Sequence, residues 1–96
     1  MVVDLSEIDG FEWDKGNRQK IERRVGVPAA EAAFLGEPLV GFDQGHSQSE
    51  QRYFLMNQAG ERYVFLIFTL RGKKVRVVSA RYMHQKEVKK YGKKIG

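Results

Sequence analysis

The segment Val75–Tyr91, VRVVSARYMHQKEVKKY, combines two kinds of local structure in one short stretch. Its first part is rich in valine, whose branched side chain suits a pleated, half-buried strand, and its last part is a Lys-rich segment with helical spacing. Arg76 and Arg81 carry planar guanidinium groups whose donors match phosphate geometry. The segment therefore predicts a strand that leads into a basic helix and faces an anion. An ordinary last strand with solvated arginines is the alternative, since basic side chains mostly lie in water.

The spacing of the two arginines leaves one structural question open. Arg76 and Arg81 are five positions apart, and an unbroken strand would direct them to opposite faces of a sheet. Either the strand ends or bulges near Ala80, which returns Arg81 to the face of Arg76, or only one of the two arginines belongs to a shared site.

The preceding residues predict an antiparallel meander that ends in this strand. Apolar and polar residues alternate with turn signals, which places strands at Gln51–Met56, Tyr63–Leu70 and Val75–Ala80, with turns at Asn57–Gly60 and Arg71–Gly72. The middle strand, YVFLIFTL, is almost unbroken apolar sequence, which is typical of a strand covered on both faces. We expect amino-terminal helices on one face and the helical segment Met83–Tyr91 on the other.

The amino-terminal half predicts a short strand at Phe11–Trp13 followed by two helices. Asp14 is a suitable N-cap for the first helix, which would run through Ile21 to Val25, with both as its inward row, and stop at Gly26. Pro28 suits the start of the second helix, which would end near Phe34. A further strand at Leu39–Phe42 and a polar loop over residues 43–50 follow. The whole pattern predicts an α+β fold with amino-terminal helices packed on an antiparallel sheet and a carboxy-terminal helix.

Composition limits the class of protein. A chain of 96 residues suits one domain, over residues 1–96, and the absence of cysteine excludes disulfides and thiol chemistry. No apolar run approaches the roughly 20 residues that a membrane-spanning helix needs. Met1–Gly10 is acidic, whereas a signal peptide begins basic and continues apolar. We therefore expect a cytoplasmic protein.

Charge is distributed unevenly along the chain. Residues 1–50 hold 5 Lys or Arg against 10 Asp or Glu, a formal charge of −5, and residues 51–96 hold 12 against 2, a formal charge of +10. A surface formed by the second half would attract polyanions, which indicates nucleic acid or an acidic partner. The cations that we expect to contact RNA are Lys20, Arg71, Lys73, Lys74, Lys86 and Lys90.

The residues with useful chemistry narrow the options for an enzyme. The sequence has no phosphate-cradling glycine loop and no zinc-type ligand cluster, so we expect no metal and no cofactor. His46 and Glu50 share one loop, and Arg52 begins the next strand. A base, an acid and arginines are the groups that metal-independent RNA cleavage by 2′-hydroxyl attack requires. His46 can titrate near neutral pH, and Glu50 can act as base or orient an arginine. A loop histidine is more often just exposed, and a Glu50–Arg52 pair is as often a surface salt bridge.

Several short motifs, in this order and spacing, resemble the BrnT toxins of bacterial type II toxin–antitoxin pairs. They are FEWD at Phe11–Asp14 with Asn17 and Lys20, the Gly26–Val27 junction with Glu31 and Ala32, HSxxExR at His46, Ser47, Glu50 and Arg52, and RVVSAR with Glu87 and Tyr91. The resemblance covers about Phe11–Tyr91. It implies a RelE-like fold, an endoribonuclease that arrests translation, and a BrnA-type antitoxin whose ribbon-helix-helix part binds operator DNA. The catalytic candidates that it implies are His46, Glu50, Arg52, Arg76 and Arg81.

One position departs from this family pattern. A histidine usually precedes the glycine that closes the first helix, and Val25 occupies that place here. If that histidine is structural, Val25 simply packs; if it is catalytic, the chain is a weak or inactive member. The rival function is therefore a nucleic-acid-binding protein without catalysis, or a degenerate toxin that represses transcription together with its antitoxin.

Overall fold

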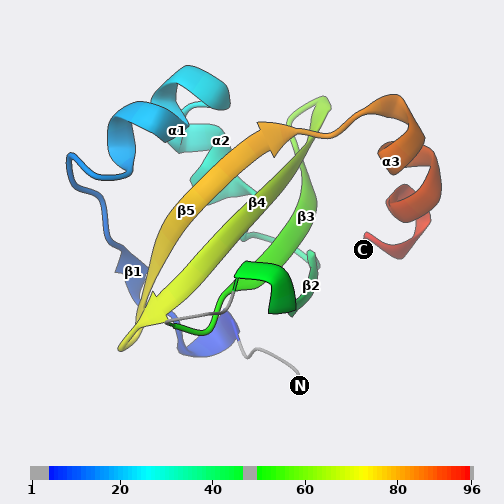
Figure 1. Cartoon of the computed structure of the whole chain (residues 1–96). Helices are drawn as coiled ribbons and strands as arrows, with labels where there is room; N and C mark the ends of the chain where they lie inside the picture. The colour runs from blue at the N-terminus through cyan, green and yellow to red at the C-terminus, as the bar shows by residue number, and fades with distance from the viewer. Residues whose placement is uncertain (1–4, 47–49, 96) are drawn as a thin grey trace.

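The computed structural model describes residues 5–46 and 50–95, and within these ranges five strands form one sheet. The strands are β1 (Gly10–Phe11), β2 (Leu39–Phe42), β3 (Tyr53–Ala59), β4 (Arg62–Arg71) and β5 (Lys74–Tyr82), in the spatial order β1-β5-β4-β3-β2. β1 pairs with β5 in parallel, and the other neighbours are antiparallel. The meander β3-β4-β5 is the predicted one, and the predicted α+β class is confirmed (Figure 1).

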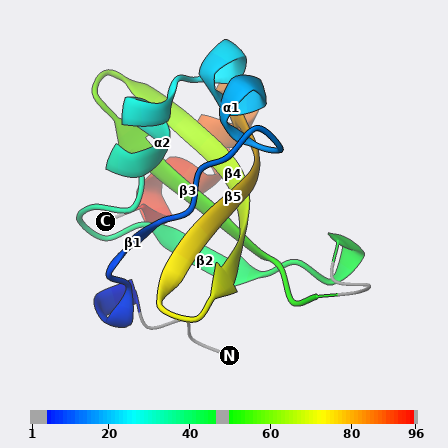
Figure 2. The ribbon, with the colours of Figure 1, turned by 90° about the vertical axis from the view of Figure 1, so that its left-hand side faces the viewer.

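Two short helices cover one face of this sheet. α1 (Arg18–Arg24) and α2 (Val27–Ala32) follow each other closely, with Gly26 between them at φ 88°. Only glycine adopts this backbone conformation readily, so Gly26 permits the sharp change of direction. Ile21 and Val25 are both buried, which confirms the predicted inward row of the first helix. In Figure 2, α2 lies on one side of the sheet and the short 3-10 helix Gln44–His46 on the other.

The main core lies between these helices and the sheet. Val64, Leu66 and Phe68 alternate along β4 and are fully buried on the helix side. Phe34, which follows α2, packs edge-on against Phe68 at 5.1 Å between ring centroids. Because β4 lies between β5 and β3, it is the central strand that its apolar sequence predicts.

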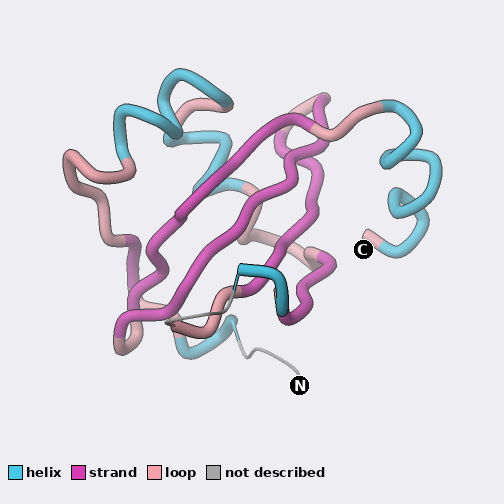
Figure 3. Tube along the Cα trace, in the orientation of Figure 1, coloured by secondary structure: helices cyan, strands magenta, loops and turns pink. Residues whose placement is uncertain are grey.

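The other face of the sheet is here called the open face, and in the part of the chain that the structure describes no α-helix packs across it. α3 (Gln85–Tyr91) leaves the end of β5 through a short loop and lies to one side of the sheet (Figures 1 and 3). None of its side chains is buried. The prediction that this segment covers the second face is therefore wrong. Lysines separate its few apolar residues, so it lacks the continuous apolar stripe that packing on a sheet requires.

The start of α1 differs from the sequence prediction. Asn17, not Asp14, occupies the N-cap position, and the helix begins only at Arg18. The Asp14 carboxylate instead accepts from the Gly16 backbone N–H at 2.7 Å. Asn17 is buried, donates to the carbonyls of Glu12 and Val77, and accepts from the Asp14 backbone N–H. The turn before the helix is thereby fixed to β5.

The end of β3 also differs from the prediction. Asn57 was expected to begin a turn, but it is a buried strand residue, and the chain turns at Gly60, which has φ 67°. The Asn57 side-chain amide donates to the carbonyls of Ala33 and Leu35 at 2.8 and 2.7 Å. These carbonyls lie just after α2, where a helix leaves acceptors unsatisfied. The long-range hydrogen bonds explain why a residue with a turn preference lies in a strand.

Candidate active site

A β-bulge in β5 answers the question about the two arginines. Across β4 and β5, Ile67 is opposite Ser79 and Phe68 is opposite Val77, so Val78 is an extra residue in the ladder. Because of this one extra residue, positions after the bulge that are an odd number of residues from Arg76 face the same side of the sheet as Arg76. Arg76 is opposite Thr69, and Arg81 is opposite Phe65, four residues earlier on β4. Because Phe65 and Thr69 point to the same face, Arg76 and Arg81 both project on the open face.

One end of the open face holds a chain of ion pairs, here called the arginine cluster. Arg76 bonds Glu12 at 3.0 Å and Asp14 at 2.9 Å. The Nη1 atom of Arg71 lies 3.5 Å from Oε1 of Glu12, and its Nη2 atom lies 3.8 Å from Oε2 of Glu50. Glu50 in turn lies 3.5 Å from Arg52, which confirms the predicted Glu50–Arg52 pair. This series of ion pairs thus brings together the end of β1, the starts of β3 and β5, and the end of β4.

Arg76 makes the shortest ion pairs of the arginine cluster. Its side chain is 16% exposed, and its Nη1 and Nη2 donate to the two oxygens of Asp14. The hydrogen bond from Arg76 lowers the pKa of Asp14, and the bond from the Gly16 backbone lowers it further. The hydrogen bond to Asp14 correspondingly raises the pKa of Arg76. Both groups therefore remain charged throughout the neutral range.

The six side chains of the arginine cluster carry equal numbers of positive and negative charges. This balance differs from the strongly basic surface that the charge of the second half of the chain predicts. It arises because folding places two acidic residues of the first half, Glu12 and Asp14, beside Arg71 and Arg76. Sequence reasoning did not identify these carboxylates as partners. Their only local signal is their spacing of two, which puts both on one side of an extended FEWD segment.

Arg81 lies away from this cluster. Four residue steps along β4 separate the partners of Arg76 and Arg81, or about 13 Å. Both Nη atoms of Arg81 bond the carboxylate of Glu87 in α3, at 2.7 and 2.8 Å, and its guanidinium lies 4.7 Å from the Phe65 ring centroid. The bond from Arg81 and a second bond from the His84 backbone N–H lower the pKa of Glu87 to about 2. The arginines therefore define two separate positions on one face.

The loop that carries the predicted proton-transfer groups is only partly described. The backbone of His46 ends the 3-10 helix Gln44–His46, whereas Ser47 lies outside the described residues. A hollow of about 370 Å³ lies beside Glu50. The other residues that line this hollow are Gln51, Tyr53, Thr69 and Leu70.

The lysines predicted to contact RNA lie in three separate places. Lys73 of the β4–β5 turn and Lys74, the first residue of β5, are exposed and lie two and three positions after Arg71 of the arginine cluster. Lys20 of α1 donates to the carbonyl of Val78, the bulged residue, at 3.3 Å. Lys86 and Lys90 lie on α3, nearer to Arg81 in sequence than to the cluster.

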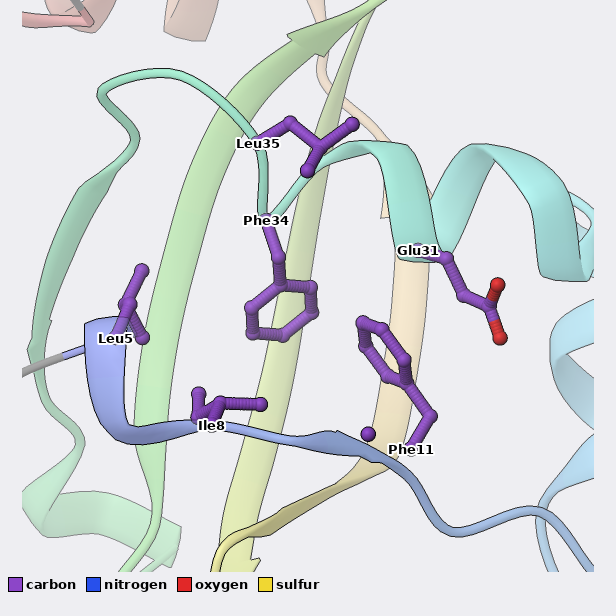
Figure 4. Close-up of a pocket in the computed structure, with 7 residues that line it drawn as sticks. Leu5, Ile8, Phe11, Glu31, Phe34 and Leu35 are labelled. Atoms are coloured by element: carbon purple, nitrogen blue, oxygen red, sulfur yellow. The ribbon is translucent and has the colours of Figure 1, made fainter.

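A second hollow lies on the helix side and has a different character. It measures about 190 Å³, and Phe11 and Phe34 point into it from β1 and from the segment that follows α2 (Figure 4). Leu35 at its rim is 71% exposed. Glu31 contributes the one carboxylate among the lining residues that the structure describes, and it accepts from the Trp13 indole N–H at 2.8 Å. The hollow is therefore mainly apolar and separate from the arginine cluster.

Comparison with protein families identifies the class of the chain. The family model described as "Ribonuclease toxin, BrnT, of type II toxin-antitoxin system" matches residues 13–87. The chain belongs to the BrnT family. The predicted family resemblance is thus confirmed. The matched range includes the three arginines of the cluster, Glu50 and Arg81, while Glu12 lies just before it.

Membership of the BrnT family states the function at a coarse level. It implies a ribonuclease toxin of a type II toxin–antitoxin system, and therefore an antitoxin partner. A search among curated proteins found no match to the chain. In the parts of the BrnT chain that the structure describes, no helix has the length and apolar character needed to cross a membrane. In the same parts, no three His, Cys, Asp or Glu side chains are grouped so that they could hold a metal ion.

Proposed function

We propose that this BrnT-family chain is a metal-independent endoribonuclease that inhibits translation by cutting RNA on the open face of its sheet. One observation carries the proposal: Arg52, Arg71 and Arg76 converge with Glu50 on one side of the sheet, inside the range that matches a ribonuclease toxin family. Arginines bind phosphate oxygens through parallel donors, and a carboxylate among them can take a proton from the substrate.

The proposed reaction uses the RNA's own 2′-hydroxyl. Glu50, or His46 from the same loop, accepts the hydroxyl proton while the 2′-oxygen forms a bond to the adjacent phosphorus. The bond from phosphorus to the 5′-oxygen breaks, and the other of the two groups gives a proton to that leaving oxygen. The products are a 2′,3′-cyclic phosphate and a 5′-hydroxyl. Guanidinium donors of Arg52, Arg71 and Arg76 stabilise the extra charge on the phosphorane.

Arg81 has a different role in this proposal from the one predicted from sequence. Its backbone lies about 13 Å along the strand from that of Arg76, and its guanidinium is held by Glu87 of α3, whereas that of Arg76 is held by Asp14. We therefore assign Arg81 to a neighbouring phosphate of the same RNA strand. Lys73, Lys74, Lys86, Lys90 and Lys20 would add contacts to the RNA backbone. Such contacts give binding that weakens as salt concentration rises.

The partner and the wider context follow from the family. We propose a RelE-like classification of the fold, a cytoplasmic location, and a BrnA-type antitoxin with a ribbon-helix-helix part. The antitoxin would cover the open face, and operator DNA would be bound only through the toxin–antitoxin complex. Burial of the open face under the antitoxin would exclude RNA from the arginine cluster.

Cleavage of end-labelled RNA by the purified chain in excess EDTA tests this proposal. We expect shortened products that end in 2′,3′-cyclic phosphate, unchanged when Mg²⁺ replaces EDTA. Cleavage only with added metal would contradict the metal-independent reaction. Labelled RNA that is retained but stays intact would instead support the rival function, which is a binding protein or a degenerate toxin that acts as a repressor with its antitoxin. The observation that favours this rival function is Val25, which is packed in the core where the family usually has a histidine.

A further inference from the structure

The turn at residues 12–17 is fixed to β5 directly beside Arg76. The buried Asn17 amide donates to the carbonyl of Val77, the residue that follows Arg76, and to the carbonyl of Glu12. Asn17 also accepts from the Asp14 backbone N–H at 2.9 Å. The backbone that carries the two acidic side chains is therefore held at a fixed distance from the strand that carries the arginine.

The two carboxylates contact only part of the Arg76 guanidinium. Nη1 donates to Glu12 and to Asp14, and Nη2 donates to the second oxygen of Asp14. These contacts use three of the five N–H donors of an arginine. The donors that remain for other acceptors, Nε–H and one Nη2–H, lie on one edge of the planar group. That edge has the geometry for two parallel hydrogen bonds to a phosphate.

Gly16 leaves room for this arrangement. A Cβ added to Gly16 would lie 3.0 Å from Arg76 Nη2 and 3.1 Å from Asp14 Oδ1, tighter than ordinary contact. The φ angle of Gly16 is not positive, so the backbone itself does not require glycine. The absence of a side chain therefore matters because of the guanidinium and the carboxylate beside it.

The Asp14–Arg76 contact contributes little to stability, since the Asp14 side chain is 55% exposed and solvent and salt screen such pairs. A role in orientation explains the two-point contact better. We infer that Asp14, supported by Glu12 and the Asn17-anchored turn, is a positioning residue that holds Arg76 so that its Nε–Nη2 edge faces phosphate on the open face. The inference rests on the proposed function for its link to RNA cleavage, but anion binding by Arg76 tests it separately.

Cleavage kinetics give the first test. The variants are Asp14→Asn, Arg76→Ala and the double variant, with Glu61→Gln at the exposed β3–β4 turn as a matched acidic control. We expect Asp14→Asn to lower the single-turnover rate at saturating RNA about tenfold or more, with a much smaller change in KM, because misplacement of a group costs rate. In the Arg76→Ala background the same change should have no further effect. A rate equal to or above that of the parent protein, or the same fold-loss in both backgrounds, would overturn the inference.

Phosphate binding gives a second test that does not depend on cleavage. The Arg76 Nε–H signal in ¹⁵N–¹H NMR spectra, identified by its loss in Arg76→Lys, should shift on titration with inorganic phosphate in the parent protein. Asp14→Asn and Gly16→Ala should weaken this binding at least several-fold, and Glu61→Gln should not. No shift in the parent, or equal or tighter binding in Asp14→Asn, would overturn the inference. A normal phosphate response in a chain that does not cleave RNA would contradict the proposed function alone.

Discussion

Arg76 and Arg81 project from the same face of the sheet although they are five positions apart in sequence. The relationship depends on one extra residue, Val78, which forms a bulge opposite Ile67 and Phe68. Both arginines bond carboxylates from outside the sheet: Arg76 bonds Asp14, and Arg81 bonds Glu87. Each of these two arginines is thus paired with a carboxylate, and the RNA binding that we propose for the open face would depend on how each pair responds to phosphate.

The Arg81–Glu87 pair predicts opposite effects for its two members. Arg81→Ala should weaken binding of a non-cleavable 2′-deoxy oligonucleotide and reduce the slope of log affinity against log salt by about 1, because one phosphate contact is lost. Glu87→Gln should strengthen binding, since the Arg81 side chain, 38% exposed against 16% for Arg76, can turn toward the RNA once it lacks its competing carboxylate. Affinities measured by fluorescence anisotropy at several salt concentrations check both effects. Equal weakening in the two variants would show that the pair acts through the fold and not through Arg81.

The low pKa of Glu87 predicts how stability depends on acid. Its folded-state pKa is about 2, below the ordinary value of 4.5, so the pair stabilises the folded protein fully above about pH 4.5. This contribution should disappear as pH falls from 4.5 towards 2. Because both side chains are partly exposed, we expect an effect of about 1 kcal/mol or less. Urea unfolding from pH 6 to pH 2 should show a smaller loss in Glu87→Gln than in the parent, and parallel curves would contradict the assignment.

Asn17 should be important for stability although it lies outside any helix or strand. Asn17→Ala removes two side-chain donors and one acceptor from a buried position and leaves the Val77 carbonyl without that partner. A loss of about 2–3 kcal/mol in the free energy of unfolding is expected. Gln19→Ala on the exposed side of α1 is the control and should change it by less than about 0.5 kcal/mol. Equal effects in urea unfolding would show that the anchored turn does not stabilise the fold.

Gly41 in β2 should tolerate no side chain, in contrast to Gly10 in β1. A Cβ at Gly41 would lie 2.4 Å from ring atoms of Phe54, whereas a Cβ at Gly10 would meet nothing within 4 Å. Gly41→Ala should therefore cost about 1–3 kcal/mol through overpacking, and Gly10→Ala should be near neutral. Thermal unfolding of both variants measures the difference. A Gly41→Ala protein as stable as Gly10→Ala would mean that the Phe54 ring moves freely.

Local sequence patterns were sufficient for most of the sheet. The apolar run of β4 and the turn around Gly72 lie in contiguous sequence, so the order of the three meander strands and the central position of β4 could be predicted, whereas the places of β1 and β2 were not. The bulge at Val78 could not be located, because Val77 and Val78 have the same strand preference. The position of α3 was predicted wrongly, since helical spacing alone does not indicate how tightly a helix packs.

The arginine cluster was predictable only in part. The Glu50–Arg52 pair joins residues two apart, so sequence suggested it directly. Asp14 and Arg76 are separated by 62 positions, and only the fold brings them together. The sequence showed a surplus of cations in the second half of the chain but not which carboxylates of the first half would pair with them.

Single-turnover cleavage of labelled RNA by the parent protein and by Arg76→Ala tests the central claim most directly, namely that the arginine cluster is the site of RNA cleavage. We predict a rate lowered at least about 100-fold in Arg76→Ala, since loss of one donor to a developing oxyanion typically has this effect. The thermal unfolding midpoint of the two proteins should be similar. Equal cleavage rates in two equally folded proteins would contradict the claim.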